Sequence, residues 1–222
     1  MTLTLPIAKY RTFVFDCDGV VLNSNRVKTE AFYQATLPYG KKAAKAMVEH
    51  HVTNGGISRY IKFAHFLDQL VPQHAFSVEG PDLNELLQAY AKTVRQGLLQ
   101  CEVAPGLEAL RQQTPEARWL IVSGSDQAEL RDVFSIRDIA RWFDGGIFGS
   151  PDTKDTILDR ETENSTITWP ALFLGDSTYD YEAASRAGLD FVFFSAWSDV
   201  KKWEHWVKNR NISYRHSVKS LN

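Results

Sequence analysis

Five short apolar runs restrict the possible folds of this chain more than any other feature of its sequence. Each run ends in small or acidic residues, and none alternates apolar with polar positions. Runs of this kind are typical of strands buried on both faces, as in a parallel sheet that helices cover. The predicted strands span residues 11–16, 118–124, 145–150, 170–176 and 190–195.

Helical periodicity occupies the intervals between most of these strands. The predicted helices span residues 107–113, 126–136, 155–164 and 179–187. Strands that alternate with helices in this way indicate an α/β protein whose core is a Rossmann-like parallel sheet.

One interval, from about residue 24 to residue 100, contains no convincing strand. Four segments there carry apolar residues at helical spacing: 28–37, 41–51, 57–70 and 82–100. They predict an α-helical cap domain inserted after the first strand. We expect a core domain of residues 1–22 and 96–222 and a cap domain of residues 23–95.

Composition narrows the class of protein. The chain has 222 residues, 44% of them hydrophobic, and a formal net charge of −2, which favours a globular protein with no field that attracts nucleic acid or anionic lipid. No apolar run reaches the length of a membrane span. Two cysteines, Cys17 and Cys101, are too few for a disulfide framework and fit the reducing cytoplasm. The basic segment from Lys201 onward is interpreted as a solvated helix face and tail. The sequence does not indicate an oligomeric state.

Polar residues stand at the ends of four predicted strands. In open α/β sheets, ligands bind outside the carboxyl ends of the strands, so these side chains are expected to meet at one edge. They are Asp16 and Asp18 after the first strand, Ser123 in the second, Lys154 beyond the third, and Asp176 and Asp180 after the fourth. Each has an ordinary alternative, such as a helix cap, a solvated lysine or a glycosyltransferase metal site. Their common position favours one shared site.

Four short motifs carry a family resemblance. "DCDGV", "VSGS", "SPDTK" and "LGDSTYD" follow one another in the order of the motifs of the haloacid dehalogenase superfamily. The chain resembles the phosphatases of that superfamily that have a helical cap, a group that includes proteins like phosphoglycolate phosphatase and β-phosphoglucomutase. The resemblance implies that Asp16 attacks phosphorus to form an aspartyl-phosphate. It also implies that Asp18 protonates the leaving oxygen and later activates water.

The same resemblance implies a Mg²⁺ cofactor. Its ligands would be the carboxylates of Asp16 and Asp176 and the backbone carbonyl of Asp18, with Asp180 behind them or orienting Lys154. Lys154 would also offset the charge of the phosphoryl group during transfer.

Ser123 and the backbone amides near Gly124 would hold the phosphoryl group by hydrogen bonds. The resemblance further implies that an aspartate at position 18 favours phosphate esters over carbon–halogen bonds, because an alkoxide leaving group needs a proton. The expected partner is therefore a small phosphorylated metabolite, such as a sugar or polyol phosphate, rather than nucleic acid or a membrane.

The segment "TNGGISRYIKF" in the expected cap places a glycine turn before a helix that carries Arg59 and Lys62. In proteins that this chain resembles, a loop here reaches the active site and selects the substrate, which makes both residues candidates for substrate binding, Arg59 before Lys62. The alternative is that both side chains are exposed. The pair His50 and His51 lacks further ligands at suitable spacing, so no metal site is predicted there.

Two other functions remain open at this stage. A phosphosugar mutase of the β-phosphoglucomutase type would use the same two aspartates but needs a second phosphate site, which Arg59, Lys28 and Lys62 could form. A binding protein without activity is less favoured, since every expected catalytic position is intact.

Overall fold

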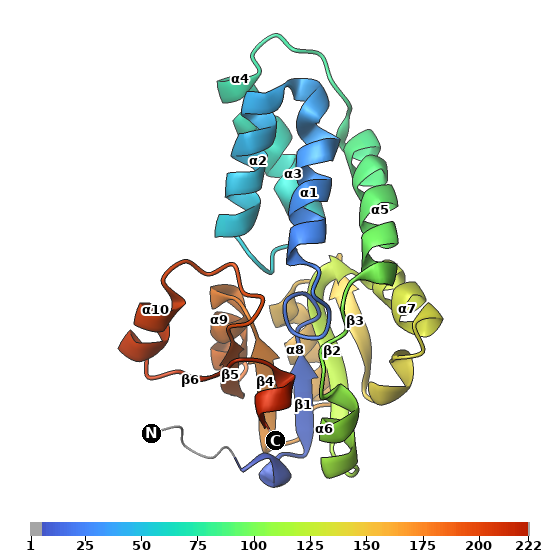
Figure 1. Cartoon of the computed structure of the whole chain (residues 1–222), viewed down its shortest axis with the longest axis vertical. Coiled ribbons are helices and arrows are strands. Elements are labelled where there is room, and N and C mark those ends of the chain that lie inside the picture. The colour runs from blue at the N-terminus through green and yellow to red at the C-terminus, as the bar shows by residue number, and fades with distance from the viewer. Residues whose placement is uncertain (1–5, 222) are drawn as a thin grey trace.

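The computed structural model describes residues 6–221, in which six strands form one parallel sheet in the order β3-β2-β1-β4-β5-β6 (Figure 1). The strands are β1 Thr12–Phe15, β2 Arg118–Asp126, β3 Gly146–Ser150, β4 Ala171–Gly175, β5 Asp190–Phe194 and β6 Ser213–Arg215. The α/β prediction is confirmed, and the five predicted strands lie within two residues of their expected bounds. The sixth strand lies in the segment interpreted as a helix face and tail.

Strand β1 shows why the apolar runs lack alternation. All four of its residues are buried, because both faces of the sheet are covered. Phe13 and Phe15 point to one face and contact the ring of Trp119, with ring centroids 6.1 and 4.6 Å apart. Val14 points to the other face and packs with Phe173.

Helices cover the two faces of the sheet separately. Buried residues of α6 Leu107–Gln113 and α7 Gln127–Ile136 join the face of Phe13, and those of α8 Lys154–Glu163 and α9 Thr178–Arg186 join the face of Val14. Helix α10 Trp203–Asn209 lies near the edge strand β6. Parallel strands therefore end at one common edge, where side chains that follow β1, β3 and β4 meet.

Five of the six α-helices between β1 and β2, all except α6, form a second layer beyond this edge (Figure 1). They are α1 Asn25–Thr36, α2 Lys41–Thr53, α3 Arg59–His65, α4 Val71–His74 and α5 Leu83–Gln100, with a π-helical turn at Phe66–Leu70. Their interior contains the rings of Phe32, Phe63 and Tyr90, with centroids of Phe32 and Tyr90 4.4 Å apart. Helix α5 continues past residue 95, where the expected cap ended; the domain bounds remain a proposal.

The two connections to this helical layer run side by side. Leu22 pairs with Val103 in an antiparallel bridge, and the Asn23 amide donates a hydrogen bond of 2.9 Å to the carbonyl of Glu102. No helix within residues 6–221 has the length and apolar character needed to cross a membrane.

Gly97 lets α5 lie directly against α1. A Cβ at this position would stand 2.2 Å from Cγ1 of Val27, so Gly97→Ala should lower the free energy of unfolding by about 1–3 kcal/mol through overpacking. Urea denaturation of Gly97→Ala, Val27→Ala and the double variant measures this. The double variant should recover part of the loss, because it removes the methyl group that clashes; strictly additive losses would contradict the contact.

Candidate active site

A cavity of about 250 Å³ lies between the carboxyl edge of the sheet and the five helices. From the core, Asp16, Asp18, Asp176 and Gly124 line it, and from the helices come Lys28, Arg59 and Lys62. Three of the six residues predicted from strand ends, Asp16, Asp18 and Asp176, thus line one cavity. Ser123, Lys154 and Asp180 do not line this cavity, but Lys154 and Asp180 lie directly behind Asp16.

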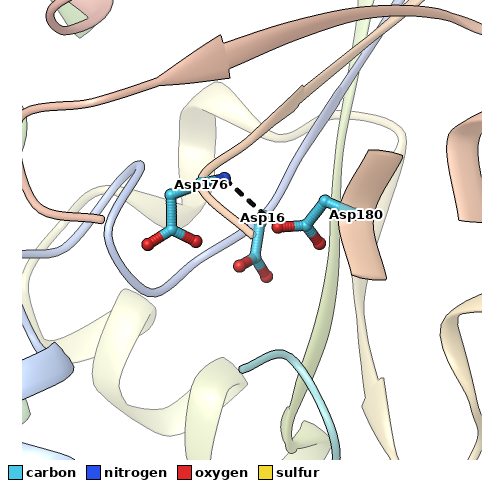
Figure 2. A group of neighbouring side chains, drawn as sticks. All are labelled: Asp16, Asp176 and Asp180. Carbon is cyan, nitrogen blue, oxygen red and sulfur yellow. Dashed lines mark hydrogen bonds between the residues drawn. The ribbon is translucent and has the colours of Figure 1, made fainter. Parts of the chain in front are cut away.

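Three buried carboxylates gather at the end of β1 and β4 (Figure 2). Asp16, Asp176 and Asp180 each offer an oxygen within 4.8 Å of the others. Burial raises the pKa of Asp16 to about 7, with Asp180 and Asp18 adding to the rise and Lys154 opposing it. Burial and the nearby charge of Asp16 raise the pKa of Asp176 well above its ordinary value. The positive charge of Lys154 therefore does not fully offset the negative charges of these carboxylates.

Asp180 is fully committed to contacts within the protein. Its Oδ2 accepts hydrogen bonds from the backbone amides of Asp176 and Ser177, at 3.2 and 3.0 Å, and from the Ser177 hydroxyl at 2.7 Å. These bonds form a capping box that begins α9. Its Oδ1 pairs with Lys154, whose Nζ also lies 2.8 Å from Oδ1 of Asp16. Lys154 thus joins the two aspartates in a buried ionic cluster.

The oxygen donors suit a hard divalent cation such as Mg²⁺, because its preferred ligands are carboxylate and carbonyl oxygens and its charge would offset the excess in the cluster. Asp16 and Asp176 are the two carboxylates that would hold the cation, since both oxygens of Asp180 already bind groups of the protein. Asp176 reaches this position only because residue 19 is glycine: Gly19 has φ +75°, and a Cβ there would stand 2.0 Å from Oδ2 of Asp176.

The Asp18 carboxylate is held by residues from both layers. It accepts hydrogen bonds from the hydroxyl of Ser24, from Lys28 Nζ and from the hydroxyl of Ser125, the last at 2.7 Å. Burial alone would raise the pKa of Asp18, but Lys28 and these hydrogen bonds lower it below its ordinary value. Lys28, expected from the sequence only as part of a second phosphate site, is thus a partner of Asp18. The four-residue spacing of Ser24 and Lys28, which places both on one helix face, could have indicated their common target.

Ser123 is completely buried within β2, and its hydroxyl accepts a 3.2 Å hydrogen bond from the Ser125 amide. Its contact with a phosphoryl group stays a prediction. Gly124 lines the cavity, and a Cβ there would stand 2.0 Å from the carbonyl oxygen of Gly56. The glycine turn before α3 therefore meets the end of β2 backbone to backbone.

Arg59 and Lys62 are both buried, so the alternative that they are exposed is wrong. The Arg59 guanidinium pairs with Glu129 at 3.1 Å and with Asp126 at 3.5 Å, and so links α3 to the start of α7. Lys62 contacts His51, a residue that sequence analysis had set aside.

Asn25 was also missed. Its side-chain amide donates hydrogen bonds to Oδ2 of Asp176, at 2.9 Å, and to the carbonyl of Trp197, at 2.8 Å. It thereby ties the start of α1 to the strand end that carries Asp176 and to the loop after β5. That loop also supplies Asp199 and Lys201 to the cavity wall.

Residues 10–188 match the sequence profile of the haloacid dehalogenase-like hydrolase family. The match spans most of the 222 residues, and the chain belongs to this family. A search of curated proteins found no match.

Solved structures share the fold at low sequence identity. A haloacid dehalogenase-like hydrolase from Bacteroides fragilis is 20% identical with a TM-score of 0.69, and the alignment covers 96% of this chain and 100% of that one. A predicted phosphoglycolate phosphatase from Haemophilus somnus is 18% identical with a TM-score of 0.67, covering 84% and 86%. A phosphonoacetaldehyde hydrolase-like protein from Oleispira antarctica is 13% identical with a TM-score of 0.74, covering 96% and 90%.

The buried ionic cluster predicts a difference between two neighbouring substitutions. Asp180→Asn removes the charge that Lys154 pairs with and should lower the free energy of unfolding by about 2–4 kcal/mol. Ser177→Ala removes only a helix-capping hydroxyl and should lower it by about 1 kcal/mol. Both are measured by chemical denaturation in the presence of a chelator. Equal losses would show that the charge of Asp180 contributes little to stability.

Proposed function

We propose that the protein is a Mg²⁺-dependent phosphatase that hydrolyses a small phosphorylated metabolite through an aspartyl-phosphate on Asp16. The observation that carries this proposal is the buried contact of 2.8 Å between Asp16 and Lys154 beside Asp176, at the floor of a cavity. A carboxylate in such a place has a cation that favours its ionised form and an open side toward the cavity.

Asp16 is the proposed nucleophile. Its attack on phosphorus displaces the alcohol and divides hydrolysis into formation and breakdown of an acyl phosphate. Lys154 stabilises the ionised form of Asp16, and Ser123 and the Gly124 amide are proposed to hold the phosphoryl oxygens. Bound Mg²⁺, held by Asp16, Asp176 and the backbone carbonyl of Asp18, would supply positive charge that offsets the repulsion between nucleophile and ester.

Asp18 is the proposed acid and base. Lys28 keeps it ionised in the free protein, whereas protonation of a leaving alkoxide needs its acid form. The negative charges of a bound phosphate ester oppose Lys28 and raise the pKa of Asp18, so we infer that it takes up a proton together with the substrate. After the alcohol leaves, the same carboxylate can take a proton from the attacking water.

Arg59 acts in this proposal as a link between cap and core that closes the cavity around the substrate, because its guanidinium is already paired with Glu129 and Asp126. The cavity volume of about 250 Å³ suits a small metabolite, such as a sugar or polyol phosphate. Two of the similar structures support this substrate class by their names. One is described as a predicted phosphoglycolate phosphatase and the other as a phosphonoacetaldehyde hydrolase-like protein. We place this reaction in the cytoplasm, where Cys17 and Cys101, both free thiols, stay reduced.

A mutase of the β-phosphoglucomutase type is less well supported. Two of the three cations considered for a second phosphate site, Arg59 and Lys28, pair with carboxylates. Release of inorganic phosphate from a monophosphate in the absence of a bisphosphate distinguishes hydrolysis from isomerisation.

The proposal is tested by a phosphate-release screen over phosphorylated sugars, polyols and small acids with Mg²⁺ present. Asp16→Asn should lower kcat at least roughly 1,000-fold, because an amide does not attack phosphorus. Chelation of divalent cations should abolish activity, and added Mg²⁺ should restore it. Asp159→Asn, an exposed aspartate on α8, serves as the matched control and should retain activity. Turnover by Asp16→Asn at the rate of the natural protein would refute the proposed nucleophile.

The role of Asp18 predicts a dependence on the leaving group. Asp18→Asn should lower kcat/KM for an alkyl phosphate by about 100- to 10,000-fold, but at least tenfold less for a nitrophenyl phosphate, whose anion leaves without a proton. Loss of the contact with Lys28 affects both substrates alike, so the ratio of the two effects isolates proton transfer. An equal loss on both substrates would argue against general acid catalysis by Asp18.

A further inference from the structure

Lys62 differs from the other buried cations around the cavity. Its side chain is almost completely buried, with 2% of the residue exposed, and it lines the cavity from α3. Its Nζ lies 2.8 Å from Nδ1 and 3.4 Å from the carbonyl oxygen of His51. Among residues 6–221, no carboxylate oxygen lies within 4.0 Å of Nζ of Lys62, so this lysine has no ion pair. Lys28, by contrast, pairs with Asp18, and Arg59 pairs with Glu129.

The charge of Lys62 is not neutralised by an ion pair within the described part of the chain, although two carboxylates act on it from a distance. Burial and, to a smaller extent, the charge of Lys28 lower the pKa of Lys62 to about 7, although Asp18 and the exposed Asp199 oppose this from across the cavity. Burial also lowers the pKa of His51 well below its ordinary value, so this ring is neutral and its Nδ1 can accept a hydrogen bond from the lysine. His51 therefore orients Lys62 without neutralising it.

We propose that Lys62, oriented by His51, binds an anionic group on the leaving part of the substrate, either a carboxylate or a second phosphate. This inference rests on the proposed function and narrows its substrate to organic phosphates that carry a second negative charge.

The position of Lys62 separates its target from the phosphoryl group. Asp16 lies at the core side of the cavity with Lys154 behind it, whereas Lys62 belongs to the cap side, where its Nζ lies 5.7 Å from the ring centroid of Phe32. Phe32 and Tyr90 give this side an apolar wall that suits a short carbon chain. An anion that reaches Lys62 gains a desolvated ammonium as its partner, and such charge-assisted hydrogen bonds are the strong ones.

The inference is tested by binding, without hydrolysis. Phosphonates keep the phosphorus group on a carbon atom, so 3-phosphonopropionate and propylphosphonate form a matched pair that differs in the terminal carboxylate. A bisphosphonate of the same chain length tests the second phosphate. Calorimetric titration of the Mg²⁺-loaded protein gives the dissociation constants. We expect the protein to bind 3-phosphonopropionate or the bisphosphonate roughly 10- to 100-fold more tightly than propylphosphonate. The tighter of the two identifies the anion.

Variants of the lysine give the decisive comparison. Lys62→Met nearly keeps the length of the side chain but removes its charge, so this variant should bind 3-phosphonopropionate, the bisphosphonate and propylphosphonate about equally tightly. Lys62→Arg keeps the charge and should retain part of the preference for the ligands with a second anionic group. Lys45→Met, an exposed lysine on α2, is the control and should keep the full preference. No preference in the natural protein, or an undiminished one in Lys62→Met, would overturn the inference, and phosphate release from the screen above would then still support the proposed function. If no ester releases phosphate, the proposed function fails instead, whatever the phosphonates show.

Discussion

The pairing of Lys154 with Asp16 and Asp180 is the interaction on which the rest of the site depends. A parallel sheet covered on both faces brings the ends of β1 and β4 together and removes them from water. Carboxylates placed there repel one another and lose hydration, and the raised pKa values of Asp16 and Asp176 reflect both effects. One buried lysine from the start of α8 opposes this rise and favours the ionised form of Asp16, and its pairing with Asp180, which caps α9, fixes where that lysine points.

The helical layer completes the electrostatics that the sheet begins. Lys28 crosses from α1 to Asp18, Arg59 crosses from α3 to Glu129, and Asn25 donates to Asp176. Each contact joins a residue of the helices to a carboxylate of the core. The cap therefore does more than cover the cavity, because the ionisation of Asp18 depends on a residue that the cap supplies.

The sequence predicts the sheet well because burial on both faces leaves an uninterrupted apolar run, as in β1 and β4. Strand β6 escapes such analysis because it has only three residues at the sheet edge, of which Ser213 and Tyr214 are exposed. The strand-end residues of the site are predictable for the same reason as the strands. The burial of Arg59 and Lys62 is not, because it depends on how α3 packs against α5 and the core. The pairing of Lys28 with Asp18 likewise joins residues of two layers whose relative placement no local pattern specifies.

The chain enters and leaves the helical layer through two adjacent segments, joined by the pairing of Leu22 with Val103. The insert therefore begins and ends at nearly the same point of the sheet, and its length or internal order places no constraint on the strands. A different set of helices could occupy the same attachment while the core kept Asp16, Lys154 and Asp180 in place. In such an architecture the carboxylate cluster at the strand ends can persist in evolution while the insert is exchanged as a whole module, provided that the new module supplies a cation to Asp18 as Lys28 does.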